Sequence, residues 1–91
     1  MAKRCSVTVV IVNRLGLHAR PAMEFVDSAS AFASTITVCK GDQRVDGKSI
    51  MQMMLLAATR GTELVVEAEG DDAEQACKAL KDIVARGFGE E

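Results

Sequence analysis

Residues 16–22 place a nucleophilic side chain, a fixed cation and the start of a helix close together. Their sequence is Gly-Leu-His-Ala-Arg-Pro-Ala, and they include His18, the one histidine of the chain. Pro21 fits the first turn of a helix, where its missing N–H removes no helical hydrogen bond, so we expect His18 at or beside the N-cap. The amides of such a first turn and the positive end of the helix dipole favour an exposed anion by about 0.3–1 kcal/mol.

The residues around His18 suit the transfer of a phosphoryl group. Arg20 offers a planar donor fork and a permanent charge for phosphate oxygens, and Gly16 lets the backbone turn tightly and keeps bulk away from the imidazole. An exposed imidazole is mostly neutral at pH 7, and its lone pair can attack phosphorus to form a labile phosphoramidate. The stretch contains no phosphate-binding glycine loop, acidic magnesium cluster or second nucleophile, so we predict a carrier that receives and gives a group, rather than an enzyme. The alternative is that His18 is an indifferent N-cap residue.

Length and composition exclude several classes of protein. A chain of 91 residues with 48% hydrophobic and 26% charged residues predicts one folded domain over residues 1–91. A net charge of −2 and three phenylalanines as the sole aromatics make nucleic acid a poor partner. The longest apolar run, Val9–Val12, is far shorter than a membrane span, and the start of the chain lacks a signal-peptide core. We therefore expect a cytoplasmic protein without a membrane or nucleic-acid partner.

Three cysteines are too few and too widely spaced for a disulfide framework or a zinc site. Cys5, Cys39 and Cys77 lie 34 and 38 residues apart, and no CxxC pair occurs. Each falls in an expected strand or helix, where we expect it to behave as a small apolar residue.

Hydrophobic periodicity predicts the order β-α-β-β-α-β-α. Strands are expected at residues 5–12, 35–39, around Val45 and at 62–69, with a turn at 40–42. A helix from His18 has apolar positions up to Phe32, a second opens with the capping box Ser49-x-x-Gln52, and a third is capped by Asp71 and ends at Gly87. The fold class is therefore α+β, a four-stranded, mainly antiparallel sheet covered on one face by three helices, without a deep pocket.

The stretch at residues 16–22 resembles the active-site signature of the HPr family, the histidine-containing phosphocarrier proteins of the bacterial phosphoenolpyruvate-dependent phosphotransferase system. The resemblance covers nearly the whole chain: its length, the element order, Phe32 after the first helix, Lys48-Ser49-Ile50-Met51 at the second helix, and residues 61–70 before the third. It implies an open-faced β-sandwich that acts as a monomer. It also implies a relay in which enzyme I phosphorylates Nδ1 of His18 and the group passes to a IIA domain, with no metal or cofactor needed on this protein. Arg20 would stabilise the phosphoryl group, supported by the loop and helix start at Gly16, Leu17, Ala19 and Pro21.

The second helix carries the remaining candidate sites. Ser49 matches the position that a bifunctional kinase/phosphorylase modifies in many relatives, although its capping role explains this serine without regulation. The helix has more apolar residues than one core-facing stripe needs, so some must be exposed. We assign Met53 and Leu56 to the core. By resemblance, the docking surface for partners would comprise Ala19, Met23, Lys48, Ile50, Met51 and Met54.

The branch of the family stays open. Sugar-branch members often present lysines on the first helix, whereas this helix has Glu24 and Asp27. The segment Asn13–Gly16 and the ending Gly87-Phe88 followed by Glu90-Glu91 resemble the nitrogen-related branch, NPr. One alternative is a regulatory protein of the same fold that acts through Ser49 or through docking.

A second alternative is a small ligand- or RNA-binding sandwich. That reading needs aromatic or basic residues on the open face of the sheet. The sequence instead places four other side chains there, namely Thr8, Thr37, Glu67 and Glu69.

Overall fold

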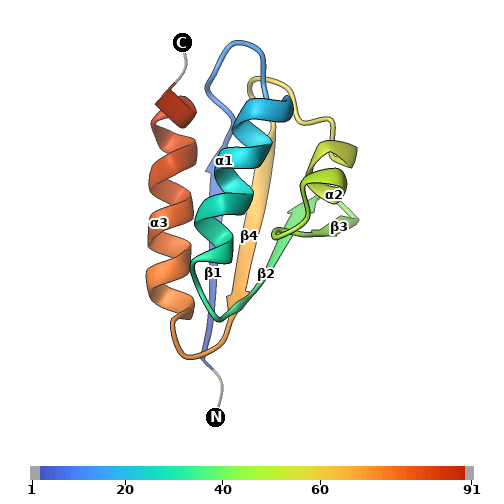
Figure 1. Ribbon diagram of the computed structural model, residues 1–91. Coiled ribbons are helices and arrows are strands. Elements are labelled where there is room, and N and C mark those ends of the chain that lie inside the picture. The colour runs from blue at the N-terminus through green and yellow to red at the C-terminus, as the bar shows by residue number, and fades with distance from the viewer. Residues whose placement is uncertain (1–2, 90–91) are drawn as a thin grey trace.

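The computed structural model describes residues 3–89, which form four strands and three α-helices in the predicted order (Figure 1). The acidic ending Glu90-Glu91, one of the branch markers, lies outside the described residues. The elements are β1 Arg4–Val10, α1 Ala19–Ser30, β2 Thr35–Lys40, β3 Gln43–Asp46, α2 Ile50–Leu55, β4 Glu63–Glu69, α3 Ala73–Ala85 and the 3₁₀ turn η1 Gly87–Gly89.

The strands form one sheet in the order β1-β4-β2-β3, and every neighbouring pair is antiparallel. Val66 on β4 lies opposite Val7 of β1 on one side and Val38 of β2 on the other. The three helices lie together on one face of this sheet, as Figure 1 shows. The predicted fold class is confirmed, and the pairing within the described strands is wholly antiparallel.

The core lies between the sheet and the helices. Alternate residues of each strand point toward the helices, because successive side chains of a strand alternate between its two faces. Phe25 of α1, Ile36 of β2 and Leu80 of α3 are almost completely buried there. All six apolar positions predicted for α3 are buried: Ala73, Ala76, Cys77, Leu80, Ile83 and Val84.

Some predicted boundaries and caps were wrong. β1 ends at Val10 rather than at residue 12, although Ile11 still exchanges backbone hydrogen bonds with Gly61 and Thr62. Phe32 lies beyond the end of α1 and packs, half-buried, against the core. The N-cap of α3 is Asp72 rather than Asp71, and its carboxylate caps no amide of its own helix. None of the helices formed by residues 3–89 has the length and apolar composition of a membrane span.

The capping box of α2 is only half formed. The Ser49 hydroxyl accepts a hydrogen bond from the Gln52 amide at 3.2 Å, as predicted. The Gln52 side chain, however, accepts from the backbone N–H of Asp46 at 2.9 Å instead of returning to Ser49. The N–H of Ser49 donates to the Asp46 carbonyl at 3.1 Å. Gln52 therefore ties α2 to the end of β3.

Candidate functional site

His18 is the N-cap residue of α1. Its backbone is extended (φ −83°, ψ −172°), its carbonyl accepts the first helical hydrogen bond from Ala22 at 3.0 Å, and its imidazole caps no helix amide. The N–H groups of Ala19 and Arg20 belong to the first turn and so have no partner within the helix. Pro21 lies in that turn, as predicted, and is buried. The half-buried His18 thus stands at a helix N-terminus, where first-turn amides favour the binding of an anion.

The loop before His18, residues 13–17, is fixed by short hydrogen bonds. Asn13 is buried, and its side-chain amide donates to the Gly16 carbonyl at 2.7 Å while the Gly16 N–H donates to the Asn13 carbonyl at 3.2 Å. The N–H of Leu17 donates to the Ala58 carbonyl at 2.8 Å, and the Leu17 side chain is buried. Hydrogen bonds therefore hold the loop both internally and to the segment after α2.

Gly16 is required for this arrangement. Its φ is +72°, and a Cβ at this position would lie 2.5 Å from the Ala58 carbonyl oxygen, a backbone atom. No side chain fits that space, and a left-handed backbone disfavours one in any case. This geometry agrees with the predicted role of Gly16 in a tight turn. Its close approach to Ala58 is a second reason why this position requires glycine.

The end of α2, which leads to Ala58, is held by side chains of the β2–β3 hairpin. Lys40 Nζ donates to the carbonyl of Leu56 at 2.9 Å, and Gln43 Nε2 donates to the carbonyl of Leu55 at 3.1 Å. These carbonyls end α2, where helical partners are missing. Ala57 follows with a φ of +47°, a left-handed conformation that turns the chain toward Ala58. The end of α2 and the His18 loop are consequently joined through Ala58.

The candidate docking side chains are mostly exposed. Ala19 and Arg20 are exposed on the first turn of α1, and Met51 of α2 has 81% of its surface exposed. Met53 and Leu56 are buried, as assigned. Large exposed apolar side chains on the loop before His18, on α1 and on α2 are Leu15, Met23, Ile50, Met51, Met54 and Leu55.

The sequence interpretation missed Leu15 and Leu55 in this set. Helical spacing could have identified Leu55, since Met51, Met54 and Leu55 share one face of α2 at i, i+3 and i+4. That face is opposite the buried Met53. Leu15 has no such signal, because it lies in a loop with no periodicity.

Lys48 and Ser49 lie away from His18. Lys48 Nζ donates to the Phe32 carbonyl at 2.7 Å, just beyond the C-terminal end of α1, whereas His18 is at its N-terminal end. A helix of this length spans about 18 Å. Ser49 adjoins Lys48 at the start of α2, while the end of α2 approaches the His18 loop. The structure thus brings the loop, Arg20 and the end of α2 together, but places Lys48 at the other end of α1.

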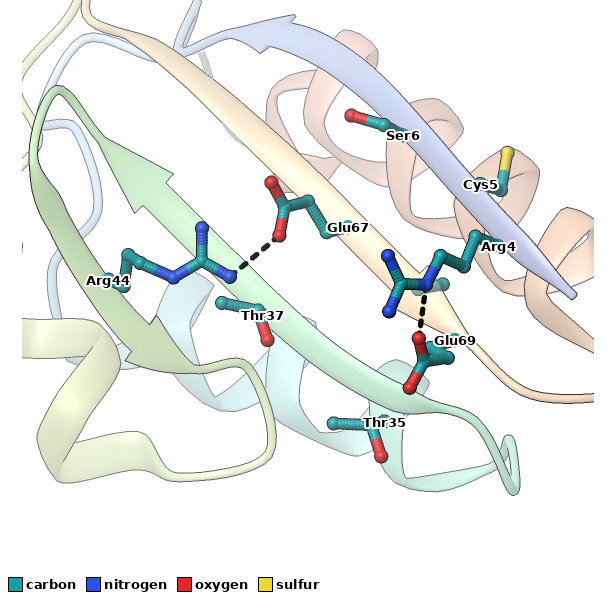
Figure 2. A pocket seen from close by; sticks show the side chains of 9 residues that line it. Arg4, Cys5, Ser6, Thr35, Thr37, Arg44, Glu67 and Glu69 are labelled. Carbon is teal, nitrogen blue, oxygen red and sulfur yellow. Dashed lines mark hydrogen bonds and ion pairs between the residues drawn. The ribbon is translucent and has the colours of Figure 1, made fainter. Parts of the chain in front are cut away.

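The open face of the sheet carries a second polar feature. A hollow of about 490 Å³ lies over the strands there, and Figure 2 shows the polar side chains that line it. Arg44 Nη2 contacts Glu67 Oε1 at 2.8 Å, and Arg4 pairs with Glu69. The inference that this face lacks basic residues was therefore wrong. Each of these two arginines is paired with a glutamate of β4 across the strands.

Comparison with known proteins identifies the family. Residues 5–86 match the family model described as "PTS HPr component phosphorylation site". Phosphocarrier protein HPr of Neisseria meningitidis serogroup A is 47% identical over 83 residues, which cover 91% of this chain and 93% of that protein. The crystal structure of HPr-C-His from Thermoanaerobacter tengcongensis superposes with a TM-score of 0.92 at 49% identity, covering 96% of this chain and 98% of that one. One chain of the crystal structure of an HPr dimer from the same organism superposes with a TM-score of 0.77 at 50% identity, covering 92% of this chain and 97% of that one.

Proposed function

The chain belongs to the HPr family of phosphocarrier proteins of the phosphotransferase system, and we propose that His18 is the residue that carries the phosphoryl group. One observation supports this assignment above the others: His18 is the N-cap residue of α1, directly before the first-turn amides and the exposed Arg20. A phosphoryl group on the imidazole would therefore lie next to the positive end of the helix and a guanidinium group.

The proposed reaction is a reversible transfer. In the first transfer, Nδ1 of His18 forms a bond to phosphorus while the bond from phosphorus to enzyme I breaks. In the second transfer, a histidine of a IIA domain forms a bond to the same phosphorus while the bond from phosphorus to Nδ1 of His18 breaks. The first-turn amides and Arg20 stabilise the added negative charge. An exposed helix end holds the anion moderately, which suits a carrier that must also release it.

Partner docking is proposed for the exposed apolar side chains beside the loop. Methionine side chains are flexible and polarisable, so they can adapt to more than one partner surface. Ala19 and Met23 lie on α1, and Ile50, Met51 and Met54 lie on α2, which packs against it. The ammonium group of Lys48 donates to the Phe32 carbonyl, beyond the C-terminal end of α1. Lys48 would therefore contact only partners that extend to that end of α1.

Incubation with enzyme I and phosphoenolpyruvate tests the His18 assignment. Intact-mass spectrometry should show the addition of one acid-labile phosphoryl group to the wild type and to Ser49→Ala, and none to His18→Ala. Arg20→Ala should accept the group about 10–100-fold more slowly, since a charge-assisted hydrogen bond contributes about 1.5–3 kcal/mol. An acid-labile phosphoryl group on His18→Ala would contradict the assignment.

The branch can be chosen by comparing enzyme I of the sugar and nitrogen branches as donors. Glu24 and Asp27 are exposed on α1, and their negative charges weaken the long-range electrostatic attraction of acidic partners. We therefore expect faster transfer from the enzyme I whose docking surface suits this acidic helix. A clear difference between the two transfer rates assigns the branch. We further propose that the chain acts in the cytoplasm as a monomer, which sedimentation at micromolar concentration tests against the dimer seen in the relative.

Regulation through Ser49 is a secondary proposal. Its hydroxyl already caps α2 through Gln52, so phosphorylation would place a dianion at a helix start that tolerates it. The negative charge of the phosphate would then change the docking of partners rather than the stability of the fold. Incubation with a bifunctional HPr kinase should modify the wild type but not Ser49→Ala, and should slow transfer from enzyme I.

A further inference from the structure

Two cysteines that are 72 positions apart in the sequence, Cys5 and Cys77, lie in the same region of the fold. Cys5 lies on β1, on the same side of the strand as Val7 and Val9, and packs against the core beneath the helices. Cys77 lies on the buried face of α3. α3 packs against β1 as well as against β4, so the two side chains lie in the same layer between the sheet and this helix. Figure 2 shows the Cys5 sulfur directed away from the Arg4 and Glu69 side chains of the open face.

The sheet register supports this placement independently. Cys5 is opposite Ala68 in the β1–β4 pair, and Val66 is the next residue of β4 on the same face. The Cys77 sulfur lies 4.0 Å from the Val66 carbonyl oxygen. Cys77 therefore sits over the part of β4 that lies beside Cys5. All three cysteines of the chain are free thiols.

The two thiols differ in accessibility. Cys77 has 1% of its surface exposed, whereas Cys5 is half-buried near the start of β1, which is an edge strand of the sheet. Cys5 is therefore the more accessible of the two cysteines. Cys39 is on the opposite face of the sheet, where its sulfur accepts a hydrogen bond from Arg44 at 3.4 Å.

We propose that Cys5 and Cys77 are a modification site, forming a reversible intramolecular disulfide when the protein meets a low-molecular-weight disulfide such as oxidised glutathione. In the first step the Cys5 sulfur attacks oxidised glutathione, forming a mixed disulfide and releasing one reduced glutathione. In the second step the Cys77 sulfur attacks the Cys5 sulfur and releases the second glutathione. Both protein thiols are oxidised, and the two thiol protons leave on the two reduced glutathione molecules.

Burial and the neighbouring Cys5 thiol raise the pKa of Cys77 to about 12, so the second step is slow at neutral pH and faster at alkaline pH. In a reducing compartment the disulfide is transient and senses oxidation rather than supporting the fold permanently.

The bond would link β1 to α3 at the end of the sheet opposite His18. The start of β1 pairs with the end of β4, while the other end of β1 leads into the His18 loop. We therefore expect the oxidised protein to keep its phosphoryl-accepting loop intact. It should also unfold at a higher urea concentration, because the link restricts the unfolded chain.

The test uses the folded, full-length protein and oxidised glutathione at pH 8, followed by alkylation of free thiols and tryptic digestion without reduction. The sequence separates the three cysteines into the tryptic peptides 5–14, 15–40 and 61–78, since the bond between Arg20 and Pro21 resists trypsin. The expected product is peptide 5–14 linked to peptide 61–78, with an intact mass lower by two hydrogen atoms and restored by dithiothreitol.

Cys39→Ala should form the same link, and Cys5→Ala should form none. Oxidation in urea provides a further control, because the unfolded chain should give all three pairings. Glutathione that stays on Cys5 without closing the link, a link to Cys39, a link between two chains, or three thiols that remain free in the folded protein would each overturn the proposal. The mapping of the wild type decides the outcome even if Cys77→Ala fails to fold.

Discussion

Replacing Gly16 by alanine should destabilise the fold and displace the loop that carries His18. Two separate effects combine at this position. The φ of +72° costs an alanine about 1–2 kcal/mol relative to glycine. The new Cβ would also lie 2.5 Å from the Ala58 carbonyl oxygen, which already accepts the Leu17 N–H at 2.8 Å.

The second effect is the larger one, because the atom in the way is backbone and cannot rotate aside. Shifting the segment at Ala58, with loss or lengthening of its hydrogen bond to Leu17, costs about 1–3 kcal/mol. Alanine also lowers the conformational entropy of the unfolded chain, which offsets about 0.4–1 kcal/mol of this loss of stability. We expect a net loss of about 2–4 kcal/mol, within the range that a domain of this size survives.

Gly41→Ala is the matched control. Gly41 has a φ of +58°, but a Cβ there would have nothing within 4 Å, so this variant isolates the backbone effect. Urea denaturation of both variants should place Gly16→Ala below Gly41→Ala by about 1–3 kcal/mol, with equal slopes against urea. If His18 is the carrier, enzyme I should phosphorylate Gly16→Ala more slowly and Gly41→Ala at the wild-type rate. Equal stability of the two variants would refute the steric reasoning.

Two further substitutions test other contacts. Hydrogen bonds from Ser34 and from the Ala33 amide lower the pKa of Asp72, so its contribution to stability is present above the ordinary carboxyl pKa and is lost as pH falls through the lower, folded-state pKa. Asp72→Asn should therefore lower the melting temperature at pH 7, with the difference from wild type narrowing on acidification; a difference independent of pH contradicts this. Ala57→Gly should raise the urea-derived stability by about 0.5–1 kcal/mol by relieving the φ of +47°, and a loss of stability would show that the position is unstrained.

The sequence predicted the start of α1 because the signals there are local. Pro21 in the first turn and the buried positions Ala22, Phe25 and Ala29 all lie within one segment of the chain. Periodicity placed the strands for the same reason, since a strand shows its alternation without reference to its partners. Boundaries and caps were predicted less well, because the ends of an element are its least regular part.

Contacts between distant residues were not predictable in the same way. The Asp72 carboxylate satisfies the Ala33 and Ser34 amides, 39 and 38 positions away, although an aspartate at a helix start is typical of a cap for its own helix. The arginines at positions 4 and 44 gave no sign that each pairs with a glutamate of β4. Such pairings depend on strand order, which periodicity does not specify.

The support of His18 lies largely outside the motif that contains it. Lys40 holds the carbonyl that ends α2, the next residue turns left-handed, and Ala58 then accepts the Leu17 N–H. Under the proposed function, the motif from residue 16 to residue 22 supplies the chemistry, whereas the end of α2 sets the position of the loop. Since α2 also carries the most exposed methionine of the docking set, Met51, a partner that docks there contacts the element whose continuation holds the imidazole in place.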